Sequence, residues 1–254
     1  LDGAEKFYQY LLSEISFRKQ DHPSMLAVNY FAGTPGDGGG VPNHPTLLLW
    51  MLGELFDATG RQEYLEHCQP MINWLEHVQL DSGELPYALG KTAEKDRVHF
   101  LCYQYNAFEY LDLAHYYHRT KNQTVLSIIE RLASYLSNGF TNRGACRYDC
   151  QQATPEVNYY TISLARALSH SQKMAFTNCP EEIQKAYQRA LSHQRTDGGF
   201  RFFSRYNYRI LEDRRSYPRN LSMMLYHLLS QIKADYEPNA IRSSAAASYS
   251  VNAV

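Results

Sequence analysis

The sequence predicts an all-α fold in which about four helix hairpins alternate between an inner and an outer ring. Two observations predict it. Apolar residues recur at helical spacing along most of the chain, and a glycine turn of one pattern separates successive pairs of helices. The length of 254 residues and the 44% hydrophobic content suit one large globular domain. We expect a single domain over residues 1–236 and an irregular C-terminal tail over 237–254.

Apolar residues at spacings of three and four place the helices. Phe7, Leu11 and Ile15 mark the first helix, and Val125 and Ile129 mark one near the middle of the chain. Glycine and proline fill most of the gaps between the periodic segments. The expected helices are 4–17, 45–58, 62–79, 98–119, 122–138, 156–171, 181–194 and 217–234.

Three of the gaps share one pattern: glycine, any residue, an apolar residue, any residue, then an aromatic residue. They are Gly83–Tyr87, Gly144–Tyr148 and Gly198–Phe202, with a degenerate copy at Asp37–Val41. Glycine supplies the backbone conformation that a helix exit needs, and the alternation after it indicates an extended segment. The helix before each turn is expected in the outer ring and the helix after it in the inner ring, and closing the ring pairs the first helix with the last.

The starts of the inner helices share an asparagine. A side chain of this type can cap the exposed amides of a first helical turn. The four residues in register are Asn43, Asn106, Asn158 and Asn220.

Composition excludes several classes of function. A formal net charge of −1 gives no general attraction to nucleic acid. The longest apolar stretches, such as Thr46–Leu52, are too short to span a bilayer, although peripheral membrane contact is compatible with the sequence. Five irregularly spaced cysteines predict free thiols in a reducing compartment, so we expect a cytoplasmic protein.

The segment Gln194–Phe200 resembles the Gln-x-x-Asp-Gly-Gly-Phe repeat of α/α toroids, and Gln79–Leu85 is a weaker copy. That superfamily includes squalene-hopene-type terpene cyclases and protein prenyltransferases. The resemblance implies an α/α toroid, or barrel, whose cavity opens at the end that carries the glycine turns. It does not fix the chemistry, because one fold hosts many activities.

The sequence departs from both families at their catalytic motifs. Class II terpene cyclases carry Asp-x-Asp-Asp at the start of an inner helix, where this chain has Tyr103–Asn106 and Pro155–Asn158. The prenyltransferase zinc ligands have no matching arrangement around Asp149 and Cys150. A small class II cyclase with a relocated acid is compatible with these departures.

Three acids near the starts of inner helices are candidate proton donors: Asp96, Asp213 and Glu156. A class II cyclase protonates its substrate with a carboxylic acid, which must stay protonated near neutral pH through burial or a second carboxylate. Asp96 ranks first because it precedes the most aromatic inner helix. The alternative for Asp96 and Asp213 is an ion pair with the adjacent Arg97 or Arg214, and Glu156 can be an ordinary helix-start acid.

Aromatic and arginine side chains at the same end are candidate substrate-binding residues. Aromatic faces stabilise cations and stack on sugar rings, and arginine pairs with carboxylate or phosphate. For single members, an ordinary aromatic core or a solvated loop is the alternative. The set is Trp50, Tyr103, Tyr105, Tyr159, Tyr160, Arg201, Arg214, Arg215 and Tyr217.

No metal and no cofactor are expected. His115 and His118 lie three apart on a helix without evident acidic or thiol partners, and Cys146 and Cys150 lack the second cysteine pair of a zinc ribbon. No phosphate-loop or dinucleotide fingerprint occurs.

Three functions stay open at this point. The first is a terpenoid cyclase that starts cyclisation of a prenylated, apolar substrate with an anionic head group by protonation. The second is a carbohydrate-active α/α-toroid enzyme, an epimerase or lyase of uronic acids, in which tyrosine transfers protons and arginine neutralises the carboxylate. The third is a non-catalytic helical-repeat scaffold. A deep apolar pocket favours the terpene, and an open groove of Tyr, Asn and Arg favours the glycan.

Overall fold

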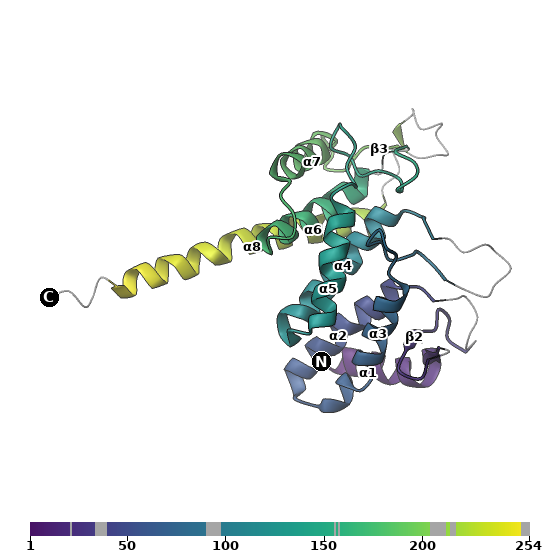
Figure 1. Ribbon diagram of the computed structural model, residues 1–254. Helices are drawn as coiled ribbons and strands as arrows, with labels where there is room; N and C mark the ends of the chain where they lie inside the picture. Colours follow the sequence, from purple (N-terminus) through teal and green to yellow (C-terminus); the bar gives the residue numbers. More distant parts are fainter. Residues whose placement is uncertain are drawn as a thin grey trace.

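The computed structural model describes residues 1–20, 22–33, 40–89, 98–154, 156, 158–203, 212–213 and 217–249. Over these residues the chain is mainly helical (Figure 1). The α-helices are α1 Asp2–Tyr10, α2 Asn43–Thr59, α3 Cys68–Val78, α4 Cys102–Thr120, α5 Gln123–Leu136, α6 Thr161–Lys173, α7 Pro180–Ser192 and α8 Pro218–Tyr249. Short helical turns are η1 Leu11–Ile15, η2 Gln62–Leu65 and η3 Asn158–Tyr160.

The strands of the described segments form two small antiparallel hairpins. Strand β1 (Phe17–Lys19) pairs with β2 (Leu26–Val28), and β3 (Phe202–Phe203) pairs with β4 (Glu212–Asp213). The expectation of an all-α fold with no substantial sheet is therefore confirmed for this part of the chain.

The helices form two layers. Helices α2, α4, α6 and α8 contact one another in that order and form the inner layer. Helices α3, α5 and α7 form the outer layer, in which α5 packs on α4 and α6, and α7 packs on α6. The core lies between the layers and is filled by fully buried side chains such as Leu52, Leu75, Leu113 and Ile129. The alternation of inner and outer helices is the one expected of an α/α toroid.

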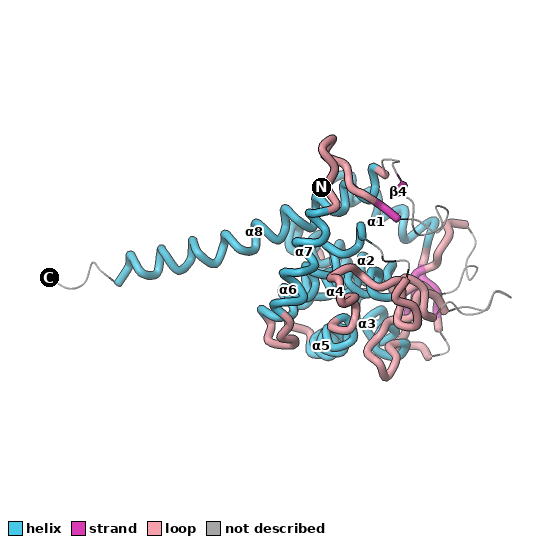
Figure 2. The backbone as a smooth tube through the Cα atoms, turned by 90° about the horizontal axis from the view of Figure 1, so that it is seen from above, coloured by secondary structure: helices cyan, strands magenta, loops and turns pink. Residues whose placement is uncertain are grey.

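The three predicted glycine turns share one backbone geometry. Gly83, Gly144 and Gly198 have φ of 90°, 78° and 84°, where residues with a side chain are strained. In each turn the glycine N–H donates to the carbonyl three residues earlier, at 2.9, 2.8 and 3.0 Å. Many of the loops gather on the side opposite the projecting end of α8 (Figure 2). The predicted repeat is therefore present in the backbone.

Asn106 has a different role from the predicted helix cap. Its Oδ1 accepts from the Leu85 N–H at 2.7 Å, and its Nδ2 donates to the Leu85 carbonyl at 2.9 Å. At the next turn the Thr161 hydroxyl accepts from the Cys146 N–H at 3.0 Å. Both contacts join the apolar residue of a glycine turn to the following inner helix, because an extended segment leaves backbone groups that need partners.

The expected ring closure is wrong. Helix α1 packs on η2, where the rings of Tyr8 and Tyr64 meet edge to face at 4.8 Å, rather than on α8. Phe7 and Leu12 are 43% and 37% exposed, because the helix turns its Tyr8 and Leu11 side toward the protein. In the part of the chain described, the helices therefore form an open arc.

The last helix is longer than expected. Helix α8 continues through Tyr249, so residues 237–249 are helical where an irregular tail was expected. The run Ala245–Ala247 favours helix, because alanine has the highest helix propensity. Figure 1 shows the C-terminal part of α8 projecting beyond the other helices. None of the described helices is long and apolar enough to cross a bilayer.

Candidate active site

Helix α4 leaves one narrow face open. Between Cys102 and Tyr116, its only side chains that are not buried are Tyr105, Phe108, Asp112 and His115. Spacings of three, four and three residues place these four side chains on one face of the helix. The opposite side faces the outer layer, where Tyr103 stacks on Tyr135 of α5 at 5.0 Å. The open face of α4 therefore looks away from the outer helices.

Side chains from the other inner helices meet this face. The Trp50 ring on α2 stacks on His115 at 5.2 Å, and the His227 ring on α8 stacks on Phe108 at 5.7 Å. Tyr160, just before α6, lies 5.9 Å from Phe108. We call this surface the inner face, formed by Trp50, Tyr105, Phe108, Asp112, His115, Tyr160, Arg166 and His227.

Aromatic contacts continue from the inner face toward the glycine turns. The Tyr105 ring lies 4.9 Å from Tyr87, which lies in the first turn, and Tyr87 lies 4.8 Å from Phe100. The Phe100 ring lies 6.3 Å from Tyr148 of the second turn. The rings thus form a chain of contacts from the glycine turns to the inner face.

Asp112 is the carboxyl group at the middle of the inner face. Burial raises its pKa to about 7, and a hydrogen bond from Thr46 and the charge of Arg166 oppose that rise. A carboxyl group that titrates near neutral pH can both accept and donate a proton. Asp112 is therefore the strongest candidate for acid–base chemistry on this face.

Arg166 on α6 supplies positive charge beside Asp112. Its Nη1 donates to His227 Nδ1 at 3.0 Å, and its guanidinium lies 5.2 Å from the centre of the Tyr226 ring. Burial, with help from Arg166, lowers the pKa of His227 to about 3, so this imidazole is a neutral acceptor near pH 7. These contacts fix the direction of the guanidinium.

A cavity of about 440 Å³ lies where α4, α6 and α8 meet. Its lining includes Arg166, His115, His170 and Tyr226. Burial is the main cause that lowers the pKa of His115 and His170 to about 4, so both imidazoles are neutral near pH 7. The cavity therefore offers polar groups and aromatic faces, with Arg166 contributing positive charge.

Several of the predicted binding residues do meet in space. Trp50, Tyr105 and Tyr160 belong to the inner face, and the Tyr159 ring lies 4.3 Å from Tyr160. Tyr103 does not join them, because it lies two positions from Tyr105 and so points to the opposite side of α4.

The other predicted binding residues lie elsewhere or outside the described residues. Tyr217 packs in a small cluster with Ile162 and Met224, and Arg201 is exposed within the third glycine turn. Arg214 and Arg215 fall outside the described residues.

Of the three predicted acids, the structure describes the side chain of Glu156 alone, and it does not lie on the inner face. Asp96 lies outside the described residues, and the backbone of Asp213 pairs with Phe202 in the β3–β4 hairpin. Glu156 forms an ion pair with Arg189 and accepts a hydrogen bond from Thr141 at 3.2 Å. It lines a separate cavity of about 640 Å³ beside α7.

Sequence reasoning missed Asp112 and Phe108. The signal that could have found them is the helical register of Tyr105, because positions three and seven residues later share its face. The search for acids covered only the starts of inner helices, whereas Asp112 lies in the second half of α4.

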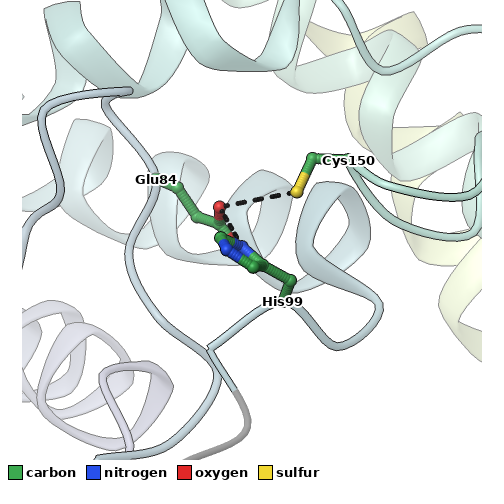
Figure 3. Close-up of side chains that lie close together, drawn as sticks. All are labelled: Glu84, His99 and Cys150. Atoms are coloured by element: carbon green, nitrogen blue, oxygen red, sulfur yellow. Dashed lines mark hydrogen bonds and ion pairs between the residues drawn. The ribbon is translucent and has the colours of Figure 1, made fainter.

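A second cluster lies at the glycine-turn end, where Glu84, His99 and Cys150 approach one another (Figure 3). Glu84 is buried in the first turn, and its Oε2 lies 2.9 Å from His99 Nδ1 and 3.9 Å from Cys150 Sγ. Burial raises the pKa of Glu84, and the charge of His99 opposes that rise. All five cysteines are free, as expected.

No protein-family model matches the sequence, and no curated protein matches it. Solved structures do match the fold. A possible member of the GH105 family from Salmonella enterica serovar Paratyphi A has a TM-score of 0.69 and 9% identity, over 93% of this chain and 66% of that one. A GH76 α-mannanase from Bacteroides thetaiotaomicron has a TM-score of 0.60 and 8% identity, over 91% and 63%. A polysaccharide lyase has a TM-score of 0.53 and 13% identity, over 66% and 53%.

These likenesses establish the fold. The chain has the α/α-toroid fold of these enzymes, of which it spans about half to two thirds of the length. The neighbours named here are enzymes of carbohydrate chemistry, and the terpene cyclase interpretation gains no support from them.

Proposed function

We propose that this chain carries the acid–base face of a carbohydrate-active α/α-toroid enzyme, a lyase or epimerase that acts on an anionic, uronic-acid-containing glycan. The observation that carries this proposal is the position of Asp112 beside Arg166 on a face lined with aromatic rings. The likeness in fold to a polysaccharide lyase and to glycoside hydrolases supports it.

Each group on the inner face matches a need of uronic-acid chemistry. Phe108, Tyr105 and Tyr160 offer rings on which sugar faces stack. Arg166 pairs with the substrate carboxylate, which makes the neighbouring C–H bond more acidic. Asp112 accepts that proton, and its pKa of about 7 suits both removing the proton and returning it to the product. Removal followed by departure of the glycosidic oxygen, which takes up a proton as it leaves, gives a lyase. Delivery of a proton to the opposite face of the carbon by a second donor, a tyrosine hydroxyl, gives an epimerase.

The carboxyl groups of the inner layer favour this chemistry over glycoside hydrolysis. Hydrolysis needs two working carboxyl groups, about 5–9.5 Å apart. Among the described residues, the other acid that opens beside the inner face is Glu54, and Arg119 and Trp50 already bind it at 2.6 and 3.0 Å. Asp112 beside Arg166 suits proton transfer at a carbon, and the neighbouring Glu109 of α4 is buried, so that burial and the charge of Asp112 raise its pKa well above the usual value.

The same face argues against a prenylated substrate. A terpene needs a deep apolar pocket, whereas the cavity that adjoins this face at Arg166 and His115 is lined mainly by polar and basic side chains, such as His170, Lys173 and Gln231. Tyrosine hydroxyls and a guanidinium suit a hydroxylated, anionic sugar better than a hydrocarbon chain.

The test is turnover of uronic-acid polymers, with polygalacturonate, alginate and heparosan as the probes. Lyase activity appears as the ultraviolet absorbance of the unsaturated product, and epimerase activity appears as solvent deuterium incorporated at the acidic carbon. Asp112→Asn should lower the rate by about 10²–10⁴-fold. The control is Asp2→Asn, which removes an exposed carboxyl of α1 and should keep the wild-type rate. Saturated reducing ends would indicate a hydrolase, and turnover of a prenyl substrate alone would refute the proposal.

A further inference from the structure

We propose that Glu84, His99 and Cys150 bind a zinc ion at the glycine-turn end of the arc. This inference does not depend on the proposed carbohydrate chemistry, because the cluster lies outside the inner face. It replaces the expectation from sequence that the protein binds no metal.

The three donor atoms converge on one point (Figure 3). His99 Nδ1 and Cys150 Sγ both approach the same carboxylate oxygen, Glu84 Oε2, at 2.9 and 3.9 Å. The three donor atoms all lie within 4.8 Å of one another. Ligands of tetrahedral zinc stand about 3.3–3.6 Å apart, given bonds of about 2.0–2.3 Å. Small side-chain rotations therefore bring the cluster to zinc geometry.

The order of the three groups excludes a cysteine-type catalytic triad. In such a triad the imidazole lies between the thiol and the carboxylate, so that one ring nitrogen contacts each. Here the carboxylate lies between the imidazole and the thiol. An arrangement in which thiol and imidazole both face one oxygen suits a shared cation, not proton transfer to the sulfur.

The Glu84 carboxylate is buried inside the cluster. Its side chain is 1% exposed, and among the described residues its Oε1 has no hydrogen bond of ordinary geometry, although the Tyr135 hydroxyl and Cys102 thiol lie close enough to interact with the carboxylate. A buried carboxylate oxygen without a partner is costly, and a bound cation removes that cost.

The donor set selects the metal. Thiolate, imidazole and carboxylate together are the ligands of zinc, whereas magnesium and calcium prefer oxygen alone. Three protein ligands leave a fourth position for water, which is the composition of open zinc sites. Binding releases the thiol proton of Cys150 to solvent, so affinity rises with pH.

The site would join segments that the sequence keeps apart. Glu84 lies in the first glycine turn, His99 precedes α4, and Cys150 follows the second turn. The Cys150 N–H also donates to Cys102 Sγ at 3.2 Å, which holds this loop against the start of α4. A zinc ion would therefore hold the first and second glycine turns against the start of α4.

The experiment measures zinc and cobalt binding to the full chain after chelation and removal of chelator. We expect one equivalent of zinc, and a rise in Tm of roughly 5–10 °C at about 100-fold excess over Kd. Cobalt in place of zinc should show a thiolate charge-transfer band and the intense visible bands of four-coordinate cobalt. Comparing Tm with and without zinc for each variant cancels any change in intrinsic stability.

Three variants and one control decide the outcome. Cys150→Ser should abolish the charge-transfer band. His99→Gln and Glu84→Gln should each weaken zinc binding by more than about 10–100-fold, which is the usual effect of losing a residue that only hydrogen-bonds to a metal ligand. Cys179→Ser, which removes a half-buried thiol at the start of α7, should bind zinc as wild type does. If the Cys150 variant does not fold, the His99 variant still tests the site, because the His99 side chain is partly exposed. No zinc binding by the wild type, or equal loss in Cys179→Ser, would overturn the proposal.

Discussion

The side-chain amide of Asn106 spans the backbone of Leu85, accepting from its N–H at 2.7 Å and donating to its carbonyl at 2.9 Å. This pair of bonds ties the first glycine turn to the inner helix that carries Asp112. It replaces the partner strand that an extended segment would otherwise need. The position of the acid–base face therefore depends on one amide in the core.

Asn106→Ala should destabilise the protein, because it leaves both backbone groups of the fully buried Leu85 unpaired. Each unpaired group costs about 1–3 kcal/mol. Thr161→Val is the matched comparison, since it removes the equivalent hydrogen bond to the Cys146 N–H at the second turn while keeping the side-chain shape. Chemical denaturation should give the larger loss of unfolding free energy for Asn106→Ala. Equal losses would show that the amide pair adds nothing beyond one hydrogen bond.

The glycine turns offer a second comparison. A methyl group at Gly83 would lie 2.3 Å from the carbonyl oxygen of Arg131, whereas no described atom lies within 4 Å of one at Gly198. Both positions have a positive φ, which costs a residue with a side chain about 1–2 kcal/mol. Gly83→Ala should therefore lower the free energy of unfolding well beyond that cost, and Gly198→Ala should stay within it. Thermal unfolding of the two variants checks the difference.

The dependence of stability on pH should report Asp112. Its pKa is about 7 in the folded protein and near 4 in the unfolded chain, so the folded state binds more protons between these values. Its contribution to stability is fully present below pH 4 and is lost as pH rises through 7. Asp112→Asn should thus match the wild type at pH 4 and exceed its unfolding free energy by about 1–3 kcal/mol above pH 7. A variant less stable than the wild type at pH 8 would contradict this assignment.

Phe108 should matter for glycan binding rather than for folding. Its ring stacks against His227 and lies at the middle of the inner face, so Phe108→Ala should weaken binding of a uronic-acid oligosaccharide by about 1–2 kcal/mol, or 5–30-fold. Calorimetric titration measures this. Tyr103→Phe serves as the control, because Tyr103 is buried against the outer layer and its substitution should leave affinity unchanged.

The sequence was informative where the determining interactions are local. Helix periodicity and the glycine pattern depend on neighbours three to five residues apart, so the helices and the turns could be predicted. The separation of Tyr103 from Tyr105 was missed because it depends on which side of α4 the outer layer covers. Nothing near Tyr105 in the sequence indicates that side, which the packing of α5 against α4 decides.

The two clusters of chemically active side chains depend on distant contacts. Cys150 lies 66 positions from Glu84, a separation that no spacing rule for metal ligands covers. The functional role of Asp112 depends on Arg166 and Thr46, which come from α6 and α2. The position of Asp112 on the inner face could have been proposed from its helical register with Tyr105. Its raised pKa could not have been predicted, because that shift comes from burial by neighbouring helices.

The exposed surroundings of Gly198 and α8 have a mechanical consequence. Gly83 and Gly144 each abut the next outer helix, at Arg131 and Lys185, while no described residue approaches Gly198 and α8 presents Leu225, Leu229 and Ile232 to solvent. In a nearest-neighbour description of a repeat array, a unit with one exposed side lacks one interface term. An exposed apolar edge of this kind favours binding of an apolar helix from another molecule. A head-to-tail contact that does not close into a ring then grows into chains. A fused hairpin with a polar outer surface would act as an end cap, adding the absent interface term and halting that growth.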